Sequence, residues 1–472
     1  MRQTLKTILS PLASLKLTVV LLALSIVLVL AGTLAQVDQG IWDVVHGYFR
    51  CYWVYIPLQI FVPRSYEIRT EVLFPGGYTI GAAMLVNLLA AHAVRFKVKA
   101  RGVGLMAGLV LTVCGGLLVG WFHNSPVPGQ VLARGGGYPG VLPLMVLGSF
   151  VYSPLVVGCV VVFGRRGGII LIHSALILLL IGEVVTAVTA VETQMPIYEG
   201  MTGHWSHDIR EVELAIVDPS NPDRDVTTVV PESILRRAAL DRHKIVHPDL
   251  PFSISVDRYL NNSELMLLPP GDRVKAEATH GFGMNYTARP ARAVSGVDPD
   301  RAIAVPSALI TFSQGSKPIG RYLVSPHFQT DAHVVTGQRL VTDGKAYMIY
   351  LRFRRYYKPY SMHLIKFNHD LYPGTSIPRN FSSEIRLVDP QRNIDREITI
   401  RMNSPLRYGG ETYFQSSWIP GASEGDPDRG TVLMAVRNPG WTIPYIACAL
   451  GAIGLIFQFG ASLIRFLRRQ TS

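Results

Sequence analysis

GGIILIHSALILLLIGEVV, residues 167–185, has the composition of a helix that crosses a membrane. A bilayer core about 30 Å thick requires roughly 20 apolar residues in helical form, and the ionisable residues of this stretch are His173 and Glu183. An ionisable side chain near the bilayer centre costs roughly 2.5 kcal/mol or more unless it is paired. Both residues therefore need partners or a function.

Five further stretches have the same character, and 49% of all residues are apolar while 17% are charged. We therefore expect an integral membrane protein with about six spanning helices. The first stretch is too long for a cleaved signal peptide and is expected to remain as an anchor. The predicted spans are Leu17–Ala35, Tyr78–Val94, Val103–Trp121, Val141–Phe163, Ile169–Val191 and Trp441–Ile464.

Basic residues beside these stretches predict the sidedness of the loops. They form four groups that fall on one side when the spans alternate, and the positive-inside rule assigns that side to the cytoplasm. We expect a multi-pass protein of the inner (cytoplasmic) membrane with both termini in the cytoplasm. These topology signals also account for much of the +12 net charge, so no nucleic-acid partner is expected. The groups are Arg2, Lys6 and Lys16; Arg95, Lys97, Lys99 and Arg101; Arg165 and Arg166; and Arg465, Arg468 and Arg469.

The long segment 192–438 has the pattern of strands. Five runs in it alternate in polarity or are rich in β-branched and aromatic residues, and they are separated by Asp, Pro, Gly and Asn. Residues 219–248 and 261–302 are polar and Pro-rich and are predicted as long loops. The expected fold is an α-helical transmembrane bundle (residues 1–191) with a β-rich extracytoplasmic domain (192–438) inserted before a final anchor (439–472). The predicted strands are Glu211–Asp218, Phe252–Tyr259, Ala308–Ser313, Ala346–Arg354 and Met362–Asn368.

The cysteines and the common motifs exclude several functions. Three of the four cysteines fall in predicted spans and Cys51 stands alone, so no Cys-x-x-Cys pair or Cys₄ zinc site exists. No zinc-protease, P-loop, nucleophile-elbow or dinucleotide motif occurs either. A thiol oxidoreductase is therefore not expected.

The most distinctive segment is FNHDLYPGTSIPRNFSSEIRLVDPQRNIDREITIRMNSPLRYGGETYFQSSW, residues 367–418. Its turn residues predict a meander with strands at 384–388, 396–402 and 411–418. MNSPLRYGGETYFQSSW (402–418), LYPGT (371–375) and LASLKLTVVLLALSIVLVLAGT (12–33) together resemble the ResB/CcsB family of System II cytochrome c biogenesis membrane proteins. The resemblance covers both ends of the chain.

This resemblance implies a function in haem delivery. Members of the family work with a ResC/CcsA-type membrane partner that carries a Trp-rich haem-handling motif, and the pair attaches haem to Cys-x-x-Cys-His of apocytochrome c. The six tryptophans of this chain are scattered, so the resemblance implies a noncatalytic subunit of a haem lyase (cytochrome c synthetase) complex. Haem b is the implied cofactor, transported or transiently bound. A thioredoxin-like apocytochrome reductase is a further implied partner. The alternative is a haem-independent, membrane-anchored β-domain scaffold or sensor.

The resemblance also bears on His173. In the family, the helix before the outer domain carries a histidine in a setting like LIHSALILLLIG (171–182), regarded as a haem ligand, and neutral imidazole is a suitable axial ligand. Arg165 and Arg166, roughly 10 Å away along the helix, are then candidates for contacts to the haem propionates. A buried histidine bonded to a neighbouring helix is the alternative.

The other ionisable residues have simpler explanations. His92 is expected at the membrane interface beside Arg95, and His204 and His207 in a solvated loop. Glu183, about 15 Å from His173 along the helix, is expected to bond a hydroxyl such as that of Thr186, or a group on a partner chain. The hairpin 103–163 departs from the family pattern and has no assigned role.

Overall fold

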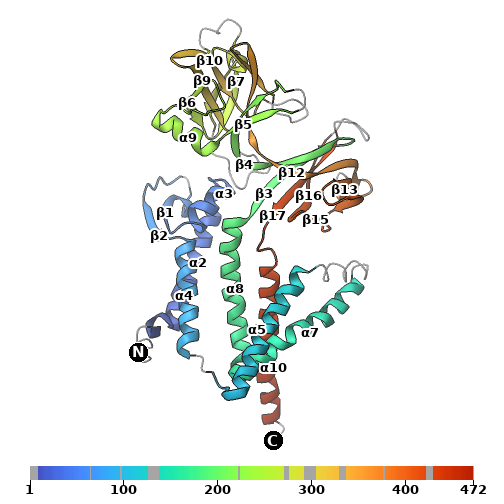
Figure 1. Ribbon diagram of the computed structural model, residues 1–472. Helices are drawn as coiled ribbons and strands as arrows, with labels where there is room; N and C mark the ends of the chain where they lie inside the picture. Colours follow the sequence, from blue (N-terminus) through green and yellow to red (C-terminus); the bar gives the residue numbers. More distant parts are fainter. Residues whose placement is uncertain are drawn as a thin grey trace. The chain divides into compact units, whose positions relative to one another are not determined.

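The computed structural model divides the chain into two compact units (Figure 1). The helical unit comprises Met1–Gln36, Ile41–Ala190 and Asn438–Ser472, and the strand unit comprises Val37–Gly40 and Val191–Arg437. The structure describes residues 9–63, 65–95, 98–125, 138–221, 224–269, 276–291, 304–328, 336–375, 378–420 and 429–470.

Each of the six predicted spans is a helix in the structure, and all six helices are long and apolar enough to cross a bilayer. These features and the family comparison given below support a multi-pass membrane protein. The predicted fifth span is two residues too long, because the chain is already a strand at Val191. The helices are α2 (Leu15–Ala35), α4 (Gly77–Arg95), α5 (Gly102–Asn124), α7 (Tyr138–Phe163), α8 (Gly167–Thr189) and α10 (Ile443–Gln470).

Small residues allow α8 and α10 to pack closely. A Cβ atom added to Gly168 would lie 2.9 Å from the carbonyl oxygen of Gly454, and the reverse distance is the same. Ala175 and Gly182 continue this face of α8 at intervals of seven residues, and both are buried. Seams of this kind are typical of helix pairs in membranes. His173 lies about 150° around α8 from the seam, at roughly 100° per residue.

α4 packs against α2 on the other side of the helical unit. Asn87 of α4 is buried and accepts a hydrogen bond from Thr18 Oγ1 at 2.7 Å. Its amide donates to the carbonyl oxygens of Leu12 at 2.6 Å and Ser14 at 3.1 Å. These bonds fix α4 against the first turns of α2. The segment between them contains α3 (Ile41–Val44), η1 (Val45–Phe49), β1 (Trp53–Pro57), η2 (Leu58–Phe61) and β2 (Glu71–Pro75).

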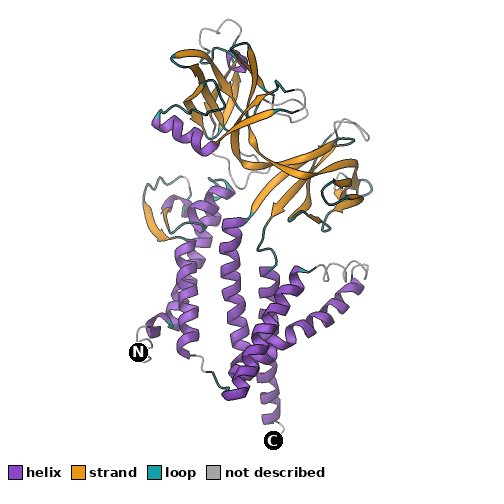
Figure 2. Ribbon diagram, in the orientation of Figure 1, coloured by secondary structure: helices purple, strands orange, loops and turns teal. Residues whose placement is uncertain are grey.

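The strand unit is built on one ten-stranded sheet (Figure 2). Its main path runs β14-β13-β12-β4-β3-β17-β16-β15, with β11 paired to β12 and β5 paired to β4. A three-stranded sheet, β10-β9-β6, and a hairpin, β7-β8, complete it. The strands are β3 (Val191–Tyr198), β4 (Thr202–Asp218), β5 (Val226–Pro231), β6 (Ser253–Leu260), β7 (Ser263–Leu267), β8 (Tyr286–Pro290), β9 (Ser307–Gln314), β10 (Lys317–Val324), β11 (Gln338–Thr342), β12 (Lys345–Leu371), β13 (Pro378–Asp389), β14 (Ile394–Arg401), β15 (Leu406–Tyr408), β16 (Glu411–Ile419) and β17 (Gly430–Arg437).

Two hydrophobic cores share the long strand β12. One core gathers around Ile310 and Phe312 of β9, and the other around Phe367 and Tyr413. Between them the β4–β12 pairing steps from Val212↔Phe353 to His207↔Arg355, so residues 208–211 leave the ladder. Asp208 Oδ1 stabilises this break by accepting from the backbone N–H groups of residues 210 and 211. β12 itself is continuous, so the two predicted strands 346–354 and 362–368 are parts of one strand.

The two predicted loops contain regular structure. Residues 219–248 include β5 and the helix α9 (Glu232–Asp241), and residues 261–302 include β7, η5 (Gly281–Met284) and β8. α9 is amphipathic and buries Leu235 and Ala238 in the first core. β5 has the sequence VTTVVP, whose β-branched residues fit a pleated surface. The loop prediction was wrong there because polar flanking residues outweighed these two short patterns.

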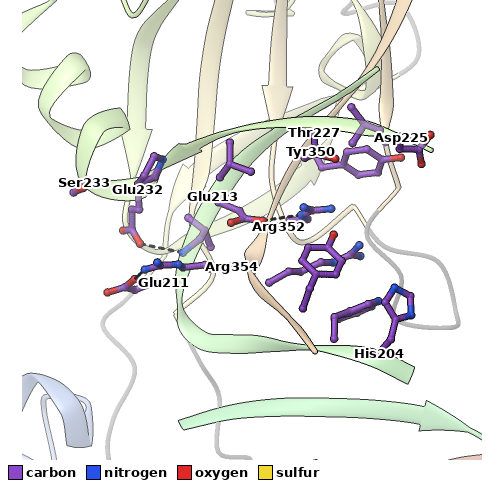
Figure 3. Close-up of a pocket in the computed structure, with 18 of the residues that line it drawn as sticks. His204, Glu211, Glu213, Asp225, Thr227, Glu232, Ser233, Tyr350, Arg352 and Arg354 are labelled. Carbon is purple, nitrogen blue, oxygen red and sulfur yellow. Dashed lines mark hydrogen bonds and ion pairs between the residues drawn. The ribbon is translucent and has the colours of Figure 1, made fainter. Parts of the chain in front are cut away.

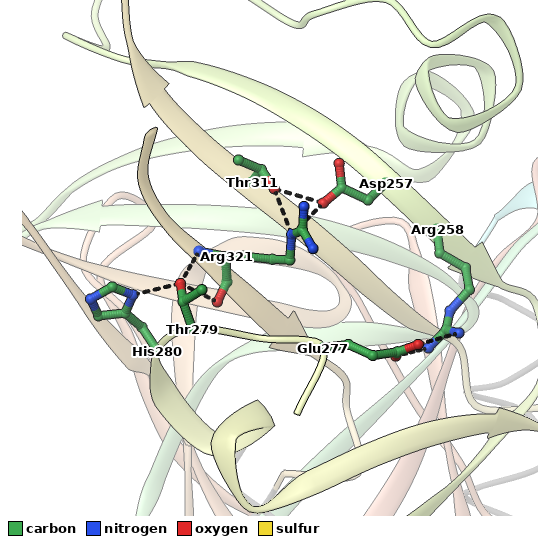
Figure 4. A network of polar contacts seen from close by, with 7 residues as sticks. All are labelled: Asp257, Arg258, Glu277, Thr279, His280, Thr311 and Arg321. Atoms are coloured by element: carbon green, nitrogen blue, oxygen red, sulfur yellow. Dashed lines mark hydrogen bonds and ion pairs between the residues drawn. The ribbon is translucent and has the colours of Figure 1, made fainter. Parts of the chain in front are cut away.

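A polar network crosses the three-stranded sheet (Figure 4). Asp257 of β6 accepts from Thr311 Oγ1 of β9 at 2.6 Å and lies 2.9 Å from Arg321 Nε of β10. Arg258 pairs with Glu277 beside it. The charged side chains are partly exposed, so their net contribution to stability is small. The cross-strand contacts fix the register of the three strands.

Candidate functional site

His173 of α8 and His92 of α4 lie side by side in the helical unit. Their ring centroids are 4.9 Å apart and the ring planes meet at 72°. His92 lies three residues before Arg95 at one end of α4, and His173 lies seven residues after Arg166 at the start of α8. Counted along the helices, His92 and His173 lie roughly 5 Å and 10 Å from these basic residues. From the sequence, His92 was expected at the membrane interface beside Arg95, with no relation to His173.

The hydrogen bonding of His92 fixes its tautomer. Its Nδ1 lies 2.8 Å from the carbonyl oxygen of Leu88, one turn earlier in α4. A carbonyl oxygen can only accept, so Nδ1 carries the proton and Nε2 of the neutral ring carries the lone pair. Histidines that bind metals usually donate their other ring N–H to such a carbonyl. In this tautomer, Nε2 is the nitrogen of His92 that can accept a hydrogen bond or bind a metal.

Two imidazole rings are a donor set that suits haem. Among the described residues there is no group of three or more His, Cys, Asp or Glu side chains that could hold a metal ion. A porphyrin supplies four nitrogen ligands to the iron, and the protein supplies one or two axial ligands. Imidazole is a common axial ligand. Both rings are half-buried among apolar helices, as an apolar macrocycle requires. The residues present fit a haem.

The two arginines proposed beside the haem remain predictions. Arg166 is exposed and ends the short turn η3 (Gly164–Arg166) that leads into α8. The side chain of Arg165 lies outside the part of the chain that the structure describes.

Glu183 forms an ion pair at the other end of α8. Its Oε1 lies 3.2 Å from Nη2 of Arg50, which follows η1 in the segment between α2 and α4. The expected bond to Thr186 is wrong, since the hydroxyl of Thr186 instead accepts from Asn438 Nδ2 at 3.3 Å. An arginine in the loop 36–77 was the available signal for this partner. Glu183 therefore has a structural role separate from His173.

The strand unit contains a large cleft of about 1340 Å³ over β5, β4 and β12 (Figure 3). Arg352 of β12 pairs with Glu213 of β4 in its floor, Nε to Oε1 at 3.0 Å, and both side chains are more than 90% buried. Arg355 lies over the ring of Trp205 at 4.0 Å in the wall. Further lining residues are His204, Glu211, Asp225, Thr227, Val229, Glu232, Arg236, Tyr350, Arg354 and Tyr357.

His204 and His207 are not in a solvated loop, as expected, but in β4. The loop assignment failed because the strand extends nine residues before the run that was recognised, Glu211–Asp218. His204 lines the cleft, whereas His207 is packed near the rings of Trp205 and Phe353. Burial lowers the pKa of His207 to about 4, with a further lowering by Arg355 and an opposing effect of Asp208.

Mild acid is expected to destabilise the strand unit through His207. Its pKa is about 4 in the folded protein and near 6.5 when unfolded, so the unfolded chain binds more protons between these values. The free energy of unfolding therefore falls as the pH drops through this window, by about 3 kcal/mol in full. Urea denaturation of the full chain at pH 7 and 4.5 measures this loss. His207→Gln should lose less stability than the wild type, and an equal loss would contradict the assignment.

Comparison with known proteins gives two matches. The sequence model of the ResB-like family matches residues 163–426, which is more than half of the chain. Protein NrfI of Wolinella succinogenes is 36% identical over 109 residues, or 23% of this chain and 11% of NrfI. The match thus spans about a tenth of the length of that relative. The family match contains α8 with His173 and most of the strand unit, but not α4 with His92.

Proposed function

The chain belongs to the ResB-like family, and from this premise we propose that it is a membrane subunit of a System II cytochrome c biogenesis complex. In this proposal it holds haem and presents it for covalent attachment to apocytochrome c. It works beside a ResC/CcsA-type membrane partner and is itself noncatalytic. The proximity of His92 and His173 is the observation that supports haem binding by this chain.

His92 and His173 are held in position in different ways. The N–H of His92 is bonded to the Leu88 carbonyl, so Nε2 carries the lone pair that would bind iron. His173 is carried on a helix whose opposite face is fixed against α10 by close packing at Gly168. Haem supplies the iron and the macrocycle that is passed to the cytochrome. The protein's task is to offer axial nitrogen ligands in an apolar setting.

The orientation follows from the basic helix ends. The positive-inside rule places the Arg166 end of α8 and both chain termini in the cytoplasm. The strand unit, which begins at Val191, then lies on the outer side of the inner membrane, where apocytochrome c is matured. Arg165 and Arg166 lie at the correct end of α8 to meet haem propionates near the cytoplasmic face.

Two measurements test this function. Cells lacking the gene should accumulate little or no c-type cytochrome, measured by haem staining of membrane proteins. The chain purified with its membrane partner should carry haem b, measured by the pyridine haemochrome absorbance. Normal cytochrome maturation in the deletion strain would instead favour a haem-independent scaffold or sensor.

A further inference from the structure

β5 is an edge strand with an uncharged sequence. It pairs with β4, and no described strand pairs with its other side. Its residues are VTTVVP, in which Val226 is 51% exposed and Val229 is 40% exposed. Exposed edges of this kind are templates for another strand, and proteins usually protect them with charges, bulges or short length.

The outward backbone groups of β5 can be identified. The N–H of Val212 in β4 donates to Glu232, directly after β5, at 3.2 Å. Backbone groups alternate in direction along a strand, so the even-numbered residues of β4 face β5. Their partners are the even-numbered residues of β5, which leaves the N–H and C=O groups of Thr227 and Val229 directed away from β4. Pro231 belongs to this outward set, where a sheet tolerates proline.

The edge of the same sheet at β14 is protected. β14, the terminal strand beside β13, has the sequence IDREITIR and exposes charged side chains along most of its length. Asp395 of β14 forms an ion pair with Arg386 of β13 at 2.6 Å. Charges of this kind disfavour pairing with another chain. The edge at β14 is therefore guarded by charges, whereas the edge at β5 is not.

The unguarded edge borders the cleft. Asp225, Thr227 and Val229 line it with alternate side chains, while Val230 is buried in the first core. Figure 3 shows Asp225 and Thr227 beside Tyr350, on the side of the cleft away from Glu232. A strand added to β5 would turn every second side chain toward this space, as in other recognition by strand addition.

We propose that the free edge of β5 docks an extended segment of unfolded polypeptide, which adds to the sheet as a strand beside Thr227 and Val229. The six residues of β5 give an edge about 20 Å long at roughly 3.3 Å per residue, enough for a segment of about six residues. Another backbone in extended form can hydrogen-bond to the alternating outward N–H and C=O groups of β5. The segment is therefore recognised chiefly by its main chain. The identification of the segment as apocytochrome c rests on the proposed function.

Peptide binding to the full-length protein in detergent tests this docking. The probe is a fluorescein-labelled 16-residue apocytochrome c peptide spanning Cys-x-x-Cys-His, followed by fluorescence anisotropy. Val229→Pro removes an outward N–H and should weaken binding by about tenfold or more. Val229→Lys places a charge on the edge at a partly exposed position and should weaken binding without affecting folding. Leu240→Lys, at an 83% exposed position of α9, is the control and should bind as the wild type does.

A second probe separates main-chain from side-chain recognition. The same peptide methylated on alternate backbone nitrogens should bind at least about tenfold more weakly, because it cannot complete the ladder. Three results would each overturn the docking site and leave the proposed function standing. They are binding of the methylated peptide as tight as that of the unmethylated one, wild-type affinity in both Val229 variants, and no binding of the peptide to the wild-type protein. Peptide binding that depends on Val229, in a protein whose deletion strain matures its cytochromes normally, would retain the docking site and reject the proposed function.

Discussion

Alanine at His92 or His173 is expected to remove most of the haem from the purified complex and to abolish cytochrome c maturation. The ring centroids of the two histidines lie 4.9 Å apart, so both side chains belong to one candidate site. Loss of an outer partner of a metal ligand already costs about 10–100-fold in affinity, and loss of the ligand itself should cost at least as much. The measurements are haem content by pyridine haemochrome absorbance and the Soret spectrum of the remaining haem.

His123→Ala is the matched control for these variants. His123 is another histidine of the helical unit, in α5, but its Nε2 is bonded to the hydroxyl of Tyr152 at 2.8 Å. This variant should keep its haem and its spectrum. Since His92 and His173 would serve one site, their double variant should be no worse than the more severe single variant. Wild-type haem content and spectrum in both single variants would reject the histidine pair as the site.

Arg352→Met is expected to destabilise the strand unit by roughly 3–5 kcal/mol, the usual cost of breaking a buried ion pair. The substitution leaves the carboxylate of Glu213 buried without the guanidinium that lies 3.0 Å away. Such a loss is a large part of a domain's total stability of about 5–15 kcal/mol. Urea denaturation of the full chain, followed by circular dichroism of the strand signal, measures it.

A neighbouring pair supplies the comparison. Arg354 and Glu211 also form an ion pair, at 3.1 Å, but their side chains are 51% and 61% exposed. Arg354→Met should therefore cost no more than about 1 kcal/mol. Combining Arg352→Met with Glu213→Met should recover much of the stability lost in the first variant, because no unpaired buried charge remains. An equal loss in the free energy of unfolding for Arg352→Met and Arg354→Met would show that burial does not determine how much these ion pairs stabilise the fold.

Long, strongly patterned elements of this fold could be predicted from the sequence. Each span has enough consecutive apolar residues to identify a helix without any knowledge of its neighbours. The strands predicted at 384–388, 396–402 and 411–418 were found because turn residues separate them. The meander itself was wrong, because β14 pairs with β13 whereas β16 pairs with β15 and β17 at the other end of the sheet. β5 and α9 were missed because each is short, and packing in the first core stabilises them more than their own sequence does. The continuity of β12 depends on its partner β4, which no local pattern reveals.

The candidate site was only half accessible to sequence reasoning. His173 stood out as an ionisable residue in an apolar helix, and the family resemblance gave it a role. Its neighbour His92 is separated from it by more than 80 residues and by the inserted hairpin of α5 and α7. Their meeting depends on how α4 packs against α8, which is tertiary information. The position of each histidine within about two turns of the basic end of its helix was the available signal.

The pairing of β3 with β17 has a consequence for how the last helix finds its place. Val191 pairs with Arg437, so the strand unit begins and ends on adjacent strands, and its folding closes a long loop between α8 and α10. Bringing the ends of a flexible loop of this length together costs about 5 kcal/mol by the (3/2)RT ln n rule. Because folding of the strand unit already closes this loop, the docking of α10 does not carry the entropic cost of closing it. We therefore expect damage to its cores to release α10 from the Gly168 seam, although no residue of the helices has changed.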